Sequence, residues 1–186
     1  MKDNKGFTLV ELIVCLAIFG IVAAAAFGFM LSGAKSFSTV GGRIDAQTHS
    51  QITMNFINEY LIDCDEAIYY NADTCTLCII NKPVNPADKL YSAYIFRYSG
   101  RNLSFSQGTA EKSGGSYICR IGEQDLLSDK TESFSVYLKN GGTDSLTVLS
   151  AEVDISFANQ GSSAVECSKT VALRNKPVYA DVSFAG

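Results

Sequence analysis

An uninterrupted apolar run near the N-terminus constrains this chain more than any other feature. Residues 7–31 read FTLVELIVCLAIFGIVAAAAFGFML, and Glu11 is the only charged residue among them. At about 1.5 Å per residue, a helix of this length spans roughly 37 Å, enough to cross the ~30 Å hydrocarbon layer of a bilayer. The run therefore predicts a transmembrane helix. Lys2 and Lys5 precede it, so the positive-inside rule predicts a cytoplasmic N-terminus and an exported remainder.

The composition is typical of one anchor followed by one exported domain. The 186 residues include 15 Lys+Arg and 19 Asp+Glu, a formal net charge of −4, and 47% of them are hydrophobic. This slightly negative charge excludes a nucleic-acid binder that works by bulk electrostatics. The high apolar content excludes a disordered chain, and the length leaves room for one domain after the helix.

Two other interpretations of the N-terminal run compete with a retained helix. A secretory signal peptide would be cut after the small residues 23–26, but its apolar region is normally about 7–15 residues long and does not begin with a carboxylate such as Glu11. A lipoprotein signal would use Cys15, but the residue before that cysteine is Val14 rather than a small one. Both interpretations explain fewer of the residues than a retained helix does.

The residues at the start of the run make the interpretation more specific. A short basic leader ends in Gly6, Phe7 and Thr8 follow, and Glu11 lies one helical turn further on. This GFTLVEL pattern, continued by the apolar helix, resembles the N-terminus of type IV prepilins and pseudopilins over roughly residues 5–26. One departure is Gly28, which stands where many members of that family have a helix-bending proline.

The resemblance implies roles for three residues. A prepilin peptidase would cut between Gly6 and Phe7 on the cytoplasmic side, and the new α-amino group of Phe7 would be N-methylated. Glu11 would pair with the α-ammonium of a neighbouring subunit's Phe7 and fix the register between subunits, because a lone carboxylate in lipid is costly. The other interpretation of Glu11 is a carboxylate near the interface that stays hydrated or is protonated.

The pattern after the apolar run predicts a longer helix and then a sheet. Apolar residues recur at spacings of three and four from Phe37 to Ile44 and again from Met54 to Ile68, and Gln47 and Gln51 keep the same phase between them. Beyond them, short alternating runs are separated by turn signals such as Gly114-Gly115 and Asn140-Gly141-Gly142. The expected strands cover residues 76–80, 91–98, 103–106, 116–121, 134–138, 146–149, 152–157 and 170–173.

We therefore expect an α+β fold in which a long N-terminal helix packs on an antiparallel β-sheet domain, a layout that matches the pilin fold. The expected segments are a leader at 1–6, a transmembrane helix at 7–31, its amphipathic continuation at 32–68 and a β-rich globular domain at 69–186.

Five of the six cysteines follow the apolar run: Cys64, Cys75, Cys78, Cys119 and Cys167. An odd number cannot all pair within one chain. The Cys75 to Cys78 spacing is that of redox and zinc motifs, but no second CxxC and no nearby histidine would complete a metal site. Buried free thiols and one or two structural disulfides remain the alternatives.

Catalytic and cofactor motifs are missing from the sequence, which has no GxSxG, no HExxH and no phosphate-binding glycine loop. His49, the only histidine, has no ligand cluster around it and is expected on an exposed helix face. The acidic residues Asp63, Asp65 and Glu66 are expected on a solvated face. We expect no enzyme, no cofactor and no metal.

The resemblance implies a structural subunit of a type IV pilus, a competence pilus or a type II secretion pseudopilus, and the long sheet region favours a minor subunit. The implied partners are other pilin or pseudopilin subunits, the prepilin peptidase, a membrane assembly platform and membrane lipid, with nucleic acid only for a DNA-uptake pilus. The protein would be single-pass, with an extracytoplasmic C-terminal domain that reaches the cell surface after assembly. The alternative is a membrane-anchored β-rich binding protein that forms no filament.

Overall fold

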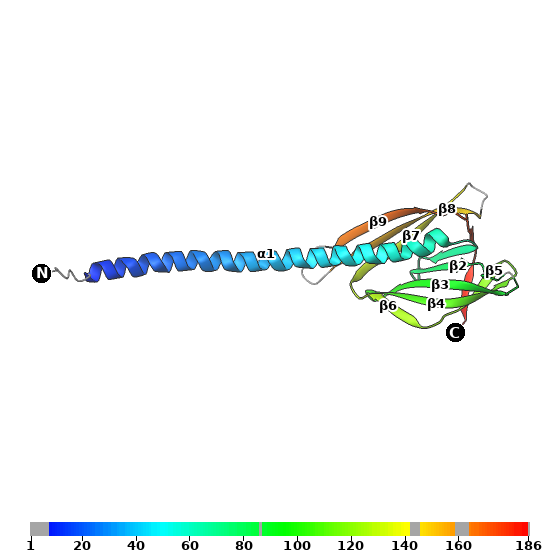
Figure 1. Ribbon diagram of the computed structural model, residues 1–186, viewed down its shortest axis with the longest axis horizontal. Coiled ribbons are helices and arrows are strands. Elements are labelled where there is room, and N and C mark those ends of the chain that lie inside the picture. The colour runs from blue at the N-terminus through cyan, green and yellow to red at the C-terminus, as the bar shows by residue number, and fades with distance from the viewer. Residues whose placement is uncertain (1–7, 86, 142–145, 159–163, 186) are drawn as a thin grey trace. The chain divides into compact units, whose positions relative to one another are not determined.

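The structure is a computed structural model that describes residues 8–85, 87–141, 146–158 and 164–185 (Figure 1). Its contacts divide the chain into two units, residues 1–41 and residues 42–186. One long helix, α1 (Leu9–Asp63), supplies the described part of the first unit and the first element of the second. The boundary between the units falls between Gly41 and Gly42, where glycines lower helix propensity but α1 continues.

The last turns of α1 pack against sheets on both sides. The side chains that they bury recur at spacings of three and four, as expected for one stripe of a helix: Ala46, Ser50, Thr53, Met54, Ile57 and Leu61. In Figure 1 these turns lie between β7 to β9 and the strands of the other sheet. Met54, Ile57 and Leu61 of the expected apolar stripe are therefore buried, whereas Phe37, Val40 and Ile44, which were expected on the same stripe, are exposed.

The helix ends at Asp63, so the expected continuation to residue 68 is wrong. Ile68 lies in the first strand, which pairs with the strand that begins at Thr76. Tyrosine and isoleucine favour strands over helices, and the backbone N–H of Glu66 already donates to the Ile80 carbonyl. The apolar side chain of Ile68 kept the helical spacing by coincidence, and strand pairing decided its conformation.

In the part of the chain that the structure describes, eleven strands form two sheets. The eight-stranded sheet has the order β10-β1-β2-β3-β4-β5-β11, with β6 paired to β4, and the three-stranded sheet has the order β7-β8-β9. Neighbouring strands are antiparallel except β1 with β10 and β5 with β11. The strand bounds are β1 Ala67–Asn71, β2 Thr76–Asn81, β3 Leu90–Ser99, β4 Asn102–Ser113, β5 Ser116–Arg120, β6 Gln124–Ser128, β7 Thr131–Asn140, β8 Val148–Phe157, β9 Val165–Ala172, β10 Val178–Tyr179 and β11 Val182–Ala185. The expected α+β fold is confirmed.

The expected strands correspond to β2, β3, β4, β5, β7, β8 and β9, several of which are longer than predicted. Residues 146–149 and 152–157 are not two strands, because Val148–Phe157 runs without interruption and Thr147 forms only an isolated bridge. The sequence did not reveal β1, β6, β10 and β11. Two of these pair in parallel at sheet ends, and β10 has two residues, too few to show an alternating pattern.

Two tight turns have successive residues at positive φ, and the one at Gly114-Gly115 confirms its sequence signal. Gly100 and Arg101, between β3 and β4, have φ of 57° and 75°, and Gly114 and Gly115, between β4 and β5, have φ of 60° and 99°. Two successive positive φ values define the turn that matches strand twist in two-residue hairpins. Part of the connection between β7 and β8, residues 142–145, lies outside the described residues.

The described part of the second unit contains two hydrophobic cores. The first lies between α1 and both sheets, and includes a group of aromatic rings in edge-on and tilted contacts: Phe56, Tyr60, Tyr94, Phe96 and Phe105. The second core uses the opposite side chains of the eight-stranded sheet, such as Cys78, Ile95 and Tyr117. Because β2 and β5 both contribute to this second core although β3 and β4 separate them, the sheet is curled.

Glycines permit the curl at the point where β4 changes partners. The first half of β4 pairs with β6 and the second half with β5. A Cβ at Gly108 would lie 2.0 Å from the carbonyl oxygen of Arg120, and a Cβ at Gly122 would lie 2.1 Å from that of Gln107. Only residues without a side chain allow the backbones to approach this closely.

Candidate functional site at the start of the N-terminal helix

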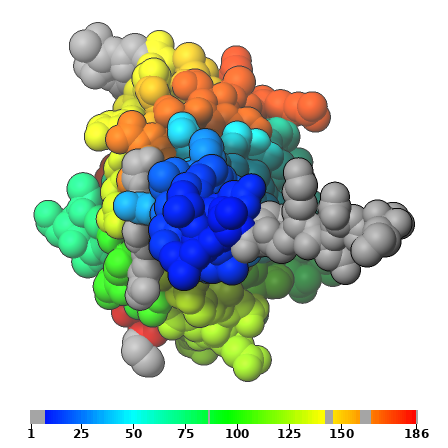
Figure 2. All heavy atoms as spheres, turned by 90° about the vertical axis from the view of Figure 1, so that its left-hand side faces the viewer, coloured from blue at the N-terminus to red at the C-terminus, as the bar shows by residue number. Residues whose placement is uncertain are grey.

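The first half of α1 presents apolar side chains that no other described residue of its own unit covers. Phe29 is 83% exposed, and the other large side chains of this segment are exposed as well: Leu9, Val10, Leu12, Ile13, Val14, Leu16, Ile18, Phe19, Ile21, Val22, Phe27, Met30 and Leu31. The first turns of α1 face the viewer in Figure 2, in blue. Among the described residues, α1 is the one helix long and apolar enough to cross a membrane, so the surface that it exposes suits lipid or another apolar helix.

The helix begins with a reciprocal cap made by Thr8 and Glu11. The Oγ1 and backbone N–H of Thr8 each donate to Glu11 Oε2 at 2.9 Å, and the Glu11 N–H donates to Thr8 Oγ1 at 3.3 Å. This is the capping box, in which an N-cap hydroxyl and a glutamate three residues later satisfy each other's orphan donors. The Thr-x-x-Glu spacing in the sequence is the signature of this capping box. The resemblance to prepilins implies only that Glu11 pairs with another subunit.

The cap fixes where the only charge of the apolar segment lies. Its hydrogen bonds hold the Glu11 carboxylate at the first turn of α1, and no ion pair joins it to another residue in the part of the chain that the structure describes. Gly6 and Phe7 lie outside the described residues, so cleavage and N-methylation there remain predictions. Thr8 thus supplies hydrogen bonds to the Glu11 carboxylate. The cation predicted to pair with this carboxylate is the α-ammonium of a neighbouring subunit's Phe7.

All six cysteines are free thiols in the structure. Cys64, Cys78 and Cys119 are fully buried, Cys75 and Cys167 are half-buried, and Cys15 is exposed on the first half of α1. Burial raises the pKa of the Cys64 thiol to about 12, and its Sγ donates to the Ala67 carbonyl at 3.4 Å. The described residues contain no group of three or more metal-ligating side chains.

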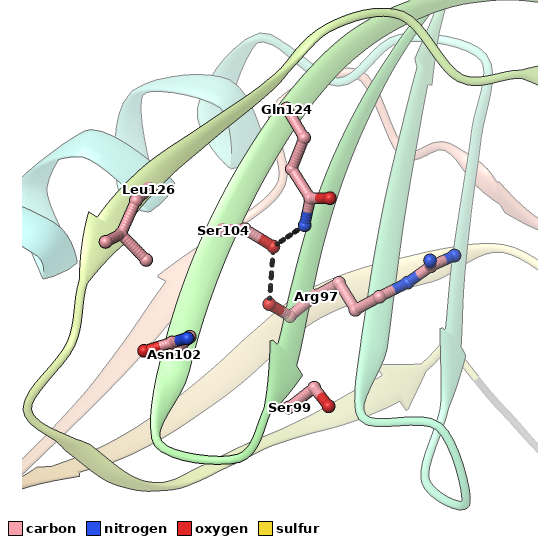
Figure 3. A pocket seen from close by; sticks show the side chains of 6 residues that line it. All are labelled: Arg97, Ser99, Asn102, Ser104, Gln124 and Leu126. Atoms are coloured by element: carbon pink, nitrogen blue, oxygen red, sulfur yellow. Dashed lines mark hydrogen bonds between the residues drawn. The ribbon is translucent and has the colours of Figure 1, made fainter.

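A polar hollow lies over β3, β4 and β6, lined by Arg97, Ser99, Asn102, Ser104, Gln124 and Leu126 (Figure 3). Gln124 donates to the Ser104 hydroxyl, which donates in turn to the Arg97 carbonyl at 3.0 Å. The Arg97 guanidinium points away from this pair and lies 5.6 Å from the centre of the Phe184 ring. The polar groups at the centre of the hollow therefore bond to each other, and none of the side chains that line it directs a charge into it.

Glu66 is not on a solvated face, contrary to the expectation from the sequence. Its side chain is only 12% exposed and pairs with Lys112 Nζ at 2.8 Å, with Lys82 Nζ at 3.9 Å and with the Tyr117 hydroxyl. Burial works against ionisation of Glu66, but the hydrogen bonds from Lys112 and Tyr117 outweigh it and hold the pKa of Glu66 below its usual value of 4.5. His49, by contrast, lies on α1 with 44% of its side chain exposed, 3.6 Å from Asp45.

We expect Glu66→Gln to destabilise the second unit by about 1.5–3 kcal/mol at pH 7, the usual value of a hydrogen bond to a charged group. Because the pKa of Glu66 is lowered in the folded state, its contribution is present above pH 4.5 and is lost as pH falls through the folded-state pKa. Thermal unfolding of the full chain in detergent, followed between about pH 3 and pH 7, measures this loss.

The matched control is Glu111→Gln, which removes a 3.4 Å pair with Arg120 whose carboxylate side is 51% exposed. An exposed pair of this kind contributes at most about 1 kcal/mol. The difference in stability between wild type and Glu66→Gln should become smaller below about pH 4.5. If the stability difference stays constant down to about pH 3, or is no larger than the loss of stability in Glu111→Gln, the proposed role of the Glu66 charge is refuted.

Residues 1–27 match the family model of the prokaryotic N-terminal methylation motif. The N-terminus is therefore a type IV prepilin-like class III signal, as the GFTLVEL pattern predicted. The motif supports a type IV pilin-like or pseudopilin subunit and so points to a structural role. Together with the apolar helix, it fits a membrane-anchored pilin. Comparisons of the chain with curated proteins and with solved structures find no match.

Proposed function

We propose that this protein is a minor subunit of a type IV pilus, a competence pilus or a type II secretion pseudopilus. Prepilin peptidase would process it after Gly6, and it would assemble through the first half of α1. The observation that carries the proposal is that the methylation motif at residues 1–27 coincides with an exposed apolar helix that begins at Leu9.

Processing would create a positively charged group next to the start of α1. Cleavage between Gly6 and Phe7 would leave a methylated α-ammonium one residue before the Thr8 cap. Glu11 is held at the same end of the helix by that cap. A cation and a carboxylate at the ends of neighbouring helices attract each other strongly where lipid excludes water. The pair would therefore fix the axial register of neighbouring subunits.

Assembly replaces lipid by protein around the apolar side chains. Lipid tails are as apolar as these side chains, so close packing rather than the hydrophobic effect would favour association. Small residues permit such packing, and the helix offers the alanines at 23–26 together with Gly20, Gly28 and Gly33, where an added Cβ would meet open space. The first half of α1 is thus suited to pack against copies of similar helices.

The size of the second unit, with eleven described strands in two sheets, supports a minor subunit rather than a compact major one. The proposed partners are other pilin or pseudopilin subunits, the prepilin peptidase, a membrane assembly platform and lipid. The proposed topology has the N-terminus in the cytoplasm and the sheets outside the membrane. An anchored binding protein would need the membrane helix but would have no use for a methylation motif.

Recovery of the protein in sheared surface filaments, or in crosslinks to other pilin subunits, tests the proposal. The crosslinked species should appear in cells that have prepilin peptidase and disappear when the peptidase gene is deleted, while the unprocessed protein stays in the membrane. A protein that is membrane-bound in both strains and never crosslinks to a pilin would support the anchored binding protein instead.

A further inference from the structure

Cys78 and Cys119 meet in the second core although they lie on strands that are not neighbours. Cys78 is on β2 and Cys119 is on β5, with β3 and β4 between them in the sheet, and the two residues are 41 positions apart in the sequence. Their Sγ atoms are nevertheless 3.8 Å apart, which is van der Waals contact between sulfur atoms. The curl of the sheet, which the close approaches at Gly108 and Gly122 permit, brings the two side chains together.

The surroundings of the two sulfur atoms are apolar. Both cysteines are fully buried, and the second core around them is built from Ala67, Ile80, Ala93, Ile95, Ala110, Tyr117 and Ala180. The hydrogen bond between the sulfurs, helped by burial, raises the pKa of Cys78, and the same bond lowers the pKa of Cys119. The two thiols therefore interact as a pair rather than as two separate small hydrophobic side chains.

We propose that the exported protein carries a disulfide between Cys78 and Cys119, which ties β2 to β5 and locks the curled sheet. The proposal rests on the proposed function for the extracytoplasmic location, where disulfides form and persist. A bond requires the sulfurs to move from 3.8 Å to about 2.05 Å. Rotation of the two side chains, with small shifts of the strands, supplies that movement.

The chemistry is a thiol–disulfide exchange. Each cysteine loses its proton, one S–S bond forms, and two electrons pass to the disulfide of an exported thiol oxidoreductase, which becomes a dithiol. An oxidant has no path to either sulfur in the folded unit, because both are fully buried. Oxidation therefore occurs during folding after export, before β5 closes over β2.

Cys64 provides a matched control within the same unit. It is equally buried, but it belongs to the first core and its thiol donates to the Ala67 carbonyl. In the disulfide form of the protein, Cys64 remains a thiol that becomes reactive only on denaturation.

Peptide mapping of the full chain tests the proposal directly. The protein is extracted from membranes of the producing cells, denatured with an alkylating agent and no reductant, and digested for mass spectrometry. We expect the peptides of Cys78 and Cys119 to be linked and that of Cys64 to be alkylated. Alkylation of both Cys78 and Cys119, or linkage of either to another cysteine, would overturn the proposal.

The same digest separates this proposal from the proposed function. An N-terminal peptide that begins at Phe7, found together with two alkylated cysteines, would leave the pilin function standing and remove the disulfide. A linked pair in a chain that still carries its leader would support the disulfide and count against processing.

The stability of the full chain gives a second, independent test. A disulfide that closes a loop of this length should make the thermal midpoint in detergent roughly 10 °C lower for protein that has been reduced in denaturant and refolded than for the oxidised protein. The shift should persist in Cys64→Ala and vanish in the double variant Cys78→Ala with Cys119→Ala. A wild-type midpoint that is unchanged after reduction in denaturant and refolding would contradict the proposal, and the peptide map decides the matter even where the double variant fails to fold.

Discussion

The Glu11→Ala protein should insert into the membrane and lose its leader normally, yet be absent from filaments. The substitution removes a carboxylate from a segment that otherwise has no charge, so insertion becomes no harder. In a filament, the α-ammonium of the neighbouring subunit's Phe7 would then be buried without its partner, which is far more costly than keeping the pair. We expect filament recovery to fall roughly tenfold or more at equal membrane abundance.

The capping box gives two control variants that separate charge from helix capping. Glu11→Gln keeps a side-chain oxygen that can accept from Thr8 but has no charge, and Thr8→Val removes the capping hydroxyl but keeps the carboxylate. If pairing with Phe7 is the role of Glu11, the Gln variant should fail to assemble as the Ala variant does. The Thr8→Val variant should assemble with only a modest loss, because the backbone N–H at position 8 still donates to Glu11 and the carboxylate keeps its charge.

The readout is paired: the amount of processed protein in membranes, and its recovery in sheared filaments or in crosslinks to other pilins. A Gln variant that assembles like wild type, with only Ala defective, would assign Glu11 to capping alone. An Ala variant that inserts, matures and crosslinks like wild type would remove any assembly role and favour the simple membrane anchor.

Gly6→Val should leave the leader attached to almost all of the protein. A peptidase that cuts next to glycine needs the backbone to approach its catalytic groups closely, and a branched Cβ at that position obstructs the approach. The retained leader keeps residues 1–6 and prevents N-methylation at Phe7, so assembly is lost as well. The mass of the protein recovered from membranes measures the effect.

The matched control for Gly6→Val is Gly28→Ala, in the membrane helix. A Cβ at Gly28 meets no atom within 4 Å, so alanine fits there and cleavage should proceed normally. Efficient cleavage of the Gly6→Val protein at the same bond would show that Gly6 does not determine processing, and the GFTLVEL resemblance would then carry no information about the cut.

Local patterns predicted the helix and most strands because their side chains alternate or recur with a clear period. The apolar side chains of Met54, Ile57 and Leu61 are buried as their spacing requires, and the glycines of the hairpins occur where the positive φ angles need them. The end of α1 was misplaced because Ile68 continues the helical spacing while its residue type favours a strand. Ile68 adopts the strand conformation rather than the helical one because it pairs with β2, a separate segment of the chain.

The features that sequence reasoning missed depend on contacts between distant segments. Glu66 sits next to Asp63 and Asp65 and so resembled a solvated acidic run, but its partners Lys112 and Tyr117 come from β4 and β5. The contact between Cys78 and Cys119 depends on the curl of the sheet, which no local pattern encodes. The Thr8–Glu11 cap is different, because its Thr-x-x-Glu spacing is local and visible in the sequence.

The N-terminal peptide of the wild-type protein, isolated from membranes and identified by mass spectrometry, tests the central claim most directly. We predict a chain that begins at Phe7 and carries an N-methyl group on its α-amine. A chain that begins at Phe27, after the alanine run, would establish a cleaved secretory signal and remove the membrane helix, and a chain that still begins at Met1 would contradict processing by prepilin peptidase.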